Sequence, residues 1–285
     1  MNKLKFNKPE SEIYIPQNID EDTALKRTTH LAIGAHQDDL EIMAYHGIAE
    51  CYKSDEEWFS GVVVTNGAGS ARTGKYQSFS NEEMMQIRKE EQNKAAEIGN
   101  YSVQIQLGYP SAEIKDPKNK QAIEDILKIL TSTKPNVVYV HNPADKHDAH
   151  IGTMAKTIEA IKMMPKNERP SKVYGCEVWR DLDWLPDDEK VALEVDKYPE
   201  LADEILKVFD SQIAGGKRYD LATIGRRLSH ATYHASHSVD ACSALTFAID
   251  LTPCVTDEIA IKDLIMDKIN KFKSGVEEKL QELAN

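Results

Sequence analysis

Hydrophobic residues occur along this chain in short apolar runs that are separated by longer amphipathic segments. Buried strands are typically rich in β-branched residues, and segments of this kind cover residues 28–35, 59–65, 101–107, 136–140 and 172–179. Between them, apolar residues recur at helical spacing over residues 42–51, 80–98, 120–130 and 151–164. This alternation predicts an α/β protein with a Rossmann-like parallel β-sheet sandwiched by helices.

Beyond residue 180 the alternation gives way to mainly helical patterns. Helices are predicted over residues 199–213, 219–237 and 256–272, followed by a tail helix that Ser274 and Gly275 separate from the last of them. One late strand is predicted at residues 245–251. We therefore expect an N-terminal arm (1–27) and a single domain (28–285), which consists of an α/β core (28–180) and a helical C-terminal extension (181–285).

Two polar clusters lie after the carboxyl ends of predicted strands. The first, Ala35–Glu41, contains one histidine and three acids, and the second is His147–His150. Ligands of parallel α/β sheets bind beyond the carboxyl ends of the strands, so we expect both clusters to contribute to one site. Because buried carboxylates need a positive partner, a divalent metal is the simplest occupant.

Metal-ligand spacing favours one set of ligands. His36 and Asp39 are three residues apart at the start of a predicted helix, so they share a face and can chelate one ion. A catalytic zinc usually has three protein ligands and one open position, and the best triplet is His36, Asp39 and His150. Asp38 and His147 would then lie near the ion without binding it. The alternative is that the acids merely complement a helix dipole. Two histidines and one carboxylate also describe an iron site, so Fe2+ stays open beside Zn2+.

Composition limits the partners of the protein. The 285-residue chain has a formal net charge of −12, which argues against nucleic acid and against an anionic membrane surface. Its four cysteines form no CxxC pair and do not indicate a disulfide framework. The first residues lack the apolar centre of a signal peptide, and no apolar run is long enough to span a bilayer. A cytoplasmic location is expected, and a homo-oligomer is left open.

The two clusters together resemble the motifs of the PIG-L (LmbE-like) family of N-acetylglucosaminyl deacetylases. The family's Ala-His-Pro-Asp-Asp-x-Glu is matched by Ala35–Glu41, with Gln37 in place of proline. Its His-Pro-Asp-His is matched by His147–His150, with the acid moved by one position. Arg88–Glu91 resembles the family's Arg-x-x-Glu helix, whereas Ser111 stands where the family often carries an aspartate. The resemblance covers roughly residues 28–180.

This resemblance implies a metal-dependent enzyme that removes acetyl from an N-acetylglucosamine-type substrate, either a small amino sugar or its conjugate. It implies His36, Asp39 and His150 as the metal ligands, a metal-bound water as the nucleophile, and Asp38 as its general base. His147 is implied as an imidazolium that stabilises the oxyanion and protonates the leaving amine. Arg88 is implied as a substrate contact.

Further basic residues are candidates for substrate binding. Arg180 follows the fifth predicted strand, so it also lies at a carboxyl end of the sheet. Lys217–Arg218 and Arg226–Arg227 have the chemistry to hold a phosphate or carboxylate, and a solvated helix face is the alternative. Trp179 and Trp184 are expected to pack in the core.

Two other functions are alternatives to deacetylation. A metal phosphoesterase is disfavoured because two-metal sites need more carboxylates than these clusters contain. A sugar-binding protein that retained the fold would need no base, so the presence of Asp38 and His147 argues against it.

Overall fold

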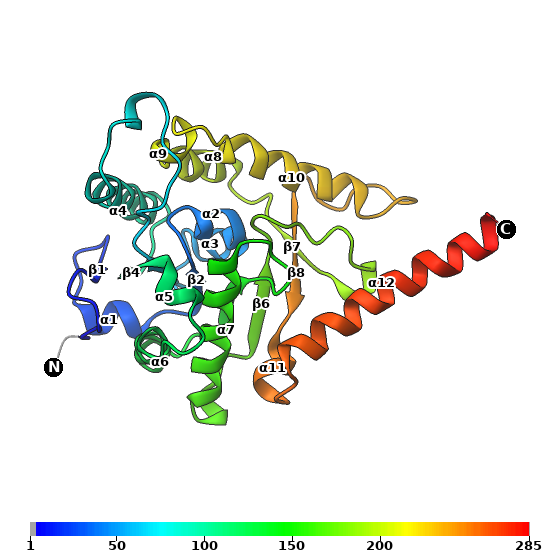
Figure 1. Cartoon of the computed structure of the whole chain (residues 1–285), viewed down its shortest axis with the longest axis horizontal. Coiled ribbons are helices and arrows are strands. Elements are labelled where there is room, and N and C mark those ends of the chain that lie inside the picture. Colours follow the sequence, from blue (N-terminus) through cyan, green and yellow to red (C-terminus); the bar gives the residue numbers. More distant parts are fainter. Residues whose placement is uncertain (1–3, 285) are drawn as a thin grey trace.

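The centre of the molecule is a sheet of eight strands in the order β1-β4-β3-β2-β5-β6-β8-β7, in a computed structural model that describes residues 4–284. Its five middle strands run parallel and correspond to the five predicted strands. In spatial order they are β4 (Val103–Tyr109), β3 (Phe59–Thr65), β2 (His30–Gly34), β5 (Val137–His141) and β6 (Lys172–Cys176). Helices lie on both sides of the sheet (Figure 1), so the predicted fold class is confirmed.

Antiparallel strands complete both edges of the sheet. β1 (Glu12–Tyr14) pairs with β4, so part of the predicted N-terminal arm joins the sheet, whereas residues 1–3 lie outside the described residues. At the other edge, β8 (Leu245–Asp250) is the predicted late strand and pairs with β6. β7 (Val191–Glu194) pairs with β8 and was not predicted, because Leu193 is its only buried residue.

Alternate residues of the middle strands contribute to two separate hydrophobic cores. Leu31 and Ile33 belong to one core and Ala32 to the other, because successive strand residues point to opposite faces. The first core includes residues from α1 (Glu21–Lys26), α5 (Ser111–Lys115), α6 (Gln121–Thr133), α7 (Asp148–Met163) and α11 (Thr252–Thr256). The second includes residues from α2 (Asp39–Met43), α3 (Tyr45–Cys51), α4 (Asn81–Ile98) and α8 (Pro199–Lys207).

The C-terminal helices differ from the prediction at two places. Residues 199–213 form two helices, α8 and α9 (Asp210–Ile213), and α10 (Tyr219–Tyr233) follows them. α12 (Ile261–Leu283) runs unbroken through Ser274 and Gly275, so the predicted break there is wrong. One glycine costs a helix interior only about 1 kcal/mol, which good helix formers around it can offset. The end of α12 projects from the body (Figure 1). Within residues 4–284, no helix has the length and hydropathy needed to cross a membrane.

Two helical glycines provide a matched test of the packing. A Cβ on Gly152 in α7 would lie 2.5 Å from the carbonyl oxygen of Ile114, whereas a Cβ on Gly225 in α10 would meet no atom within 4 Å. We expect Gly152→Ala to lower the free energy of unfolding by about 1–3 kcal/mol, because backbone must shift. Gly225→Ala should raise it by up to about 1 kcal/mol through helix propensity. Urea denaturation measures both, and equal effects would contradict a tight contact between α5 and α7.

Candidate metal centre

The carboxyl ends of β2 and β5 lie side by side where the strand order of the sheet reverses. β2 pairs with β3 on one side and with β5 on the other, and such a switch point is where open α/β sheets bind ligands. Residues 36–39 follow β2 directly, and His147–His150 lie at the start of α7, after β5. The two polar clusters therefore come from the two strands that meet at this point.

Three side-chain atoms form a nearly equilateral triangle there. His36 Nδ1 lies 3.2 Å from His150 Nε2 and 3.3 Å from Asp39 Oδ2. His150 Nε2 lies 3.4 Å from the same carboxylate oxygen. Atoms bound to zinc at tetrahedral positions, about 2.0–2.2 Å from it, are about 3.3–3.6 Å apart. The triangle thus has the dimensions of one face of a tetrahedral site, and this set of residues fits a divalent metal.

Asp145 fixes the orientation of the His150 ring. Its Oδ2 lies 3.3 Å from His150 Nδ1, and both side chains are fully buried. The same carboxylate also accepts hydrogen bonds from the amides of His147 and Trp179. A proton on Nδ1 leaves the Nε2 lone pair free to face the triangle. Asp148, the acid of the second motif, is exposed on the first turn of α7. Sequence reasoning missed Asp145, because only the loop conformation directs it to His150.

Removing the charge of Asp145 should weaken metal binding without removing a ligand. We expect Asp145→Asn to reduce metal affinity about 10–100-fold, the usual effect of losing such a partner of a metal-bound histidine. Competition with a chelating dye measures this affinity. Asp148→Asn is the matched control and should bind metal normally. Equal affinities in the two variants would contradict the assigned role of Asp145.

His141 is a second residue of the cluster that sequence reasoning missed, although it directly follows the predicted fourth strand and ends β5. Its Nε2 lies 3.4 Å from Asp39 Oδ2, and its ring stacks on that of His150 with centroids 3.8 Å apart. The backbone amide of Ala35 donates to this Nε2 at 2.9 Å, so the lone pair that a metal would need is already engaged. Burial, with the nearby His150, lowers the pKa of His141 to about 4. His141 therefore packs beside the triangle as a neutral ring.

Asp38 lies next to the triangle in an unusual backbone conformation. Its φ of 91° is left-handed, which is costly for a residue other than glycine. Its amide donates to Gln92 Oε1 at 3.2 Å, and Gln92 donates in turn to Glu41 at 2.9 Å. Burial and the carboxylates of Asp39 and Glu41 raise the pKa of Asp38 well above its usual range, although Arg88, 3.7 Å away, opposes this. Such a group is suited to proton transfer.

In contrast to Asp38, the neighbouring groups Asp39 and His147 have lowered pKa values. The imidazoles of His150 and His141 outweigh burial and hold the pKa of Asp39 well below its usual range, so Asp39 is a carboxylate. His147 lies with its ring centroid 4.9 Å from that of His36 and 4.6 Å from that of His150. Burial and these two rings lower the pKa of His147 to about 4, so its ring is neutral near pH 7.

The cluster lines a pocket of about 480 Å³. His36, Asp38, Asp39 and His147 line it together with polar, basic and aromatic side chains that include Arg88, Ser111, Trp179, Lys217, Tyr219 and Arg226. Trp179 is half-buried and packs against the second hydrophobic core, and the chain after β6 also brings it into this lining. Trp184 packs against Phe272 of α12.

The predicted substrate-binding arginines have different surroundings. Arg88 is buried and donates to the carbonyl of Gln37 at 2.7 Å and to Ser70. Arg226 lines the pocket. Arg180 and Arg218 are exposed and do not line it, and Arg218 forms an ion pair with Asp220 at 2.7 Å.

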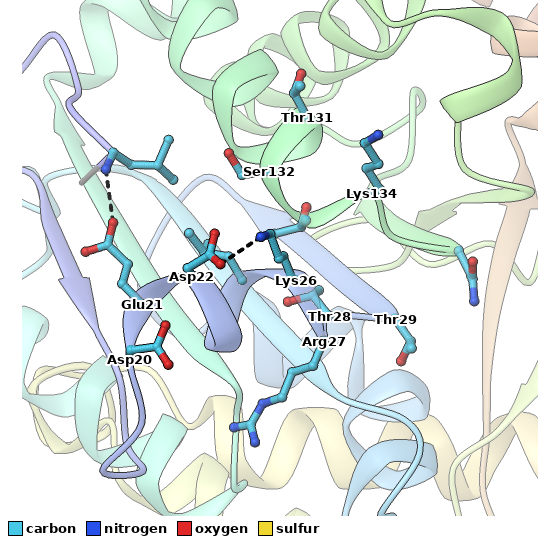
Figure 2. Close-up of a pocket in the computed structure, with 14 residues that line it drawn as sticks. Asp20, Glu21, Asp22, Lys26, Arg27, Thr28, Thr29, Thr131, Ser132 and Lys134 are labelled. Carbon is cyan, nitrogen blue, oxygen red and sulfur yellow. Dashed lines mark hydrogen bonds and ion pairs between the residues drawn. The ribbon is translucent and has the colours of Figure 1, made fainter. Parts of the chain in front are cut away.

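A larger cavity, about 880 Å³, lies at the opposite end of the strands (Figure 2). Its lining includes Thr28, which precedes β2. Two of its cations are already paired, Lys26 with Asp22 at 2.7 Å and Lys134 with Glu168 at 2.8 Å. Among the described residues that line it there is neither a histidine nor a cysteine, and we assign it no chemistry.

A known protein family matches the part of the chain that contains both polar clusters. The family model described as PIG-L, GlcNAc-PI de-N-acetylase, matches residues 31–161. Residues 31–161 of this chain are similar to the PIG-L family. The match includes the donor triangle, Asp38 and His147, so the family resemblance of the motifs is confirmed.

Solved structures resemble this chain in fold at low sequence identity. The conserved protein TT1542 from Thermus thermophilus is 15% identical, with a TM-score of 0.62, over 79% of this chain and 94% of that chain. GalB, the 4-carboxy-2-hydroxymuconate hydratase from Pseudomonas putida, is 17% identical, with a TM-score of 0.61, over 82% and 100%. The N,N′-diacetylchitobiose deacetylase from Pyrococcus horikoshii is 17% identical, with a TM-score of 0.59, over 77% and 83%. A deacetylase and a hydratase thus share this fold.

Proposed function

We propose that this protein is a metal-dependent N-deacetylase that hydrolyses the acetamide of an N-acetylated amino sugar or its conjugate. The observation that carries the proposal is the donor triangle beside Asp38, a separate buried acid that lines the same pocket. The family description and the deacetylase among the structures of this fold support it. Four free cysteines fit a reducing compartment, and the cytoplasm is the proposed location.

His36, Asp39 and His150 would hold the metal. A divalent ion bound there supplies polarisation of the amide carbonyl and lowers the pKa of a water molecule to about 7. Two imidazoles and one carboxylate suit Zn2+, which is our proposed metal. Fe2+ is the alternative, because it binds the same types of ligand. Metal binding requires the neutral form of His36 and His150, so it releases any proton that their ring nitrogens carry toward Asp39.

Asp38 and His147 would carry the proton and the developing charge. Asp38 accepts a proton from the attacking water as the new carbon–oxygen bond forms. His147 donates a hydrogen bond to the oxyanion, an interaction that is typically worth about 10²–10³ in rate. Because its pKa is about 4, the neutral ring is the donor, in place of the imidazolium inferred from the motif. The proton on Asp38 then passes to the amine as the carbon–nitrogen bond breaks, which yields acetate and the free amino sugar.

Acetate release tests this function. We expect the metal-loaded protein to release acetate from at least one member of a panel of N-acetylglucosamine glycosides and phosphates. A chelator should abolish the release, and added Zn2+ or Fe2+, tested separately, should restore it. Phosphate esters and a conjugated hydroxy-dienoate serve as comparison substrates, because a phosphoesterase and a hydratase are the competing activities. Turnover of either comparison substrate without any acetate release would contradict the proposal.

A further inference from the structure

The second half of α12 extends beyond the body of the protein as an exposed helix (Figure 1). Every residue from Asn270 to Leu283 is exposed. An isolated helix of this length is only marginally stable in water, because most helix stability in proteins comes from the packing of an apolar face. Within residues 4–284, this half of α12 therefore lacks the contacts that usually stabilise a helix.

One face of this exposed half is nevertheless hydrophobic. Phe272, Val276 and Leu280 follow one another at intervals of four residues and Leu283 comes three later, so they form one stripe along the helix. Their side chains are 41%, 42%, 56% and 84% exposed. The stripe continues the face through which Ile269 packs against the first core. Of the twelve exposed large hydrophobic residues within residues 4–284, five belong to α12. A continuous exposed stripe of this kind is typical of an interaction surface.

The spacing of the stripe is the same in both directions. From Ile269 to Leu283 the intervals between its hydrophobic residues are three, four, four and three, so the pattern is symmetric about Val276. We propose that the stripe pairs with the same stripe of a second copy of this chain, with the two α12 helices antiparallel and centred near Val276. Phe272 of each copy then lies opposite Leu280 of the other, as a two-fold symmetric interface requires. The pairing is independent of the proposed function.

The charges along α12 favour this antiparallel orientation. Residues 267–275 contain three lysines and one aspartate, a net charge of +2, whereas residues 277–284 contain three glutamates and one lysine, a net charge of −2. Glu189 of the body forms ion pairs with Lys268 and Lys271, which lowers the first charge to +1 without reversing its sign. An antiparallel pair sets each half against the half of opposite charge, whereas a parallel pair would set like charges together.

Lys273 and Glu277 show how the charges would meet. They are four residues apart on the same side of the stripe, and within one chain their side chains lie 3.6 Å apart. In an antiparallel pair centred near Val276, the same side of each helix meets across the two-fold axis. Lys273 of each copy therefore comes close to Glu277 of the other, which forms a cluster of four alternating charges beside the hydrophobic contact.

The same charges disfavour a lipid surface as the occupant. Helices that lie on anionic membranes carry mainly lysine and arginine on their polar face. Residues 270–283 contain as many acidic residues as basic ones, three of each. The exposed half of α12 therefore has no net attraction to an anionic surface, whereas its two opposed charges are complementary to a second copy of itself.

Sedimentation velocity of the full chain tests the pairing. Two helices of this length bury less surface than a standard protein interface, so we expect a monomer–dimer equilibrium between about 1 and 300 µM. Val276→Glu sets two carboxylates against each other at the centre and should raise the dissociation constant at least about tenfold. Leu280→Glu should act in the same way. Ser274→Glu is the matched control, because helical spacing places this residue opposite the stripe, and it should still dimerise.

Disulfide cross-linking tests the orientation. Cys242 is the one free cysteine that is not buried within residues 4–284, so Cys242→Ser provides the background. Val276→Cys should then form an interchain disulfide on mild oxidation, whereas Leu283→Cys should not, because its two copies would lie about 20 Å apart at opposite ends of the pair. Cross-linking of both variants would show a parallel pair and overturn the arrangement. A chain that stays monomeric over the whole range, or a dimer that Val276→Glu and Leu280→Glu leave intact, would overturn the proposal.

Discussion

Replacing Asp38 by asparagine should remove nearly all turnover while the metal stays bound. Asparagine has almost the same shape and tolerates a left-handed backbone, so the φ of 91° at this position can be kept. Its amide cannot accept a proton from water, however, and loss of a general base typically costs about 10²–10⁴ in rate. The measurements are kcat for acetate release and metal content by elemental analysis.

Two controls make the Asp38 result specific. Asp148→Asn changes an exposed acid that does not line the pocket, and its kcat should equal that of the unmodified enzyme. The melting temperature of Asp38→Asn should be measured as well, because the change leaves Arg88 without the carboxylate that lies 3.7 Å from it. A folded, metal-loaded Asp38→Asn enzyme with more than about a tenth of normal kcat would show that another group is the base.

His150→Ala should lose the metal itself. His150 contributes one of the three atoms of the triangle and is held by Asp145, and its side chain is completely buried. Only two ligands remain after the change, and a site with two protein ligands falls short of the three that catalytic zinc sites usually have. We expect metal content to fall to less than about a tenth of normal after dialysis.

His141→Gln is the matched comparison for His150→Ala. Both histidines lie within 3.4 Å of the Asp39 carboxylate and stack on each other, but the Nε2 of His141 already accepts from the amide of Ala35. His141→Gln should therefore retain its metal. Normal metal content in His150→Ala, or loss of metal in His141→Gln alone, would contradict the assignment of ligands.

The hydrophobic pattern of the sequence predicted those helices and strands in which buried side chains recur at regular spacing. The middle strands alternate between two cores, as Leu31 and Ala32 do. Ser80 is the N-cap of α4 and forms a capping box with Glu83, which explains why the sequence predicts the start of this helix correctly. β1 and β7 escaped prediction because edge strands of three and four residues bury too little to leave a pattern.

Only those site residues that lie close to the end of a predicted strand could be predicted from the sequence. His36, Asp39 and His150 directly follow a strand or open the helix after one, so strand order alone brings them to the same edge of the sheet. Asp145 and Trp179 reach the site through loop conformations, which no local periodicity encodes. Arg180 and Arg218 show the converse, because a basic residue near a strand end or helix start can still face solvent.

Anomalous diffraction from crystals of the metal-loaded protein is the most direct test of the proposed metal centre. It should show one ion about 2.0–2.2 Å from His36 Nδ1, Asp39 Oδ2 and His150 Nε2, with Asp38 and His141 outside its coordination sphere. An ion bound at another position, or one that takes His141 in place of His36 or His150, would contradict it.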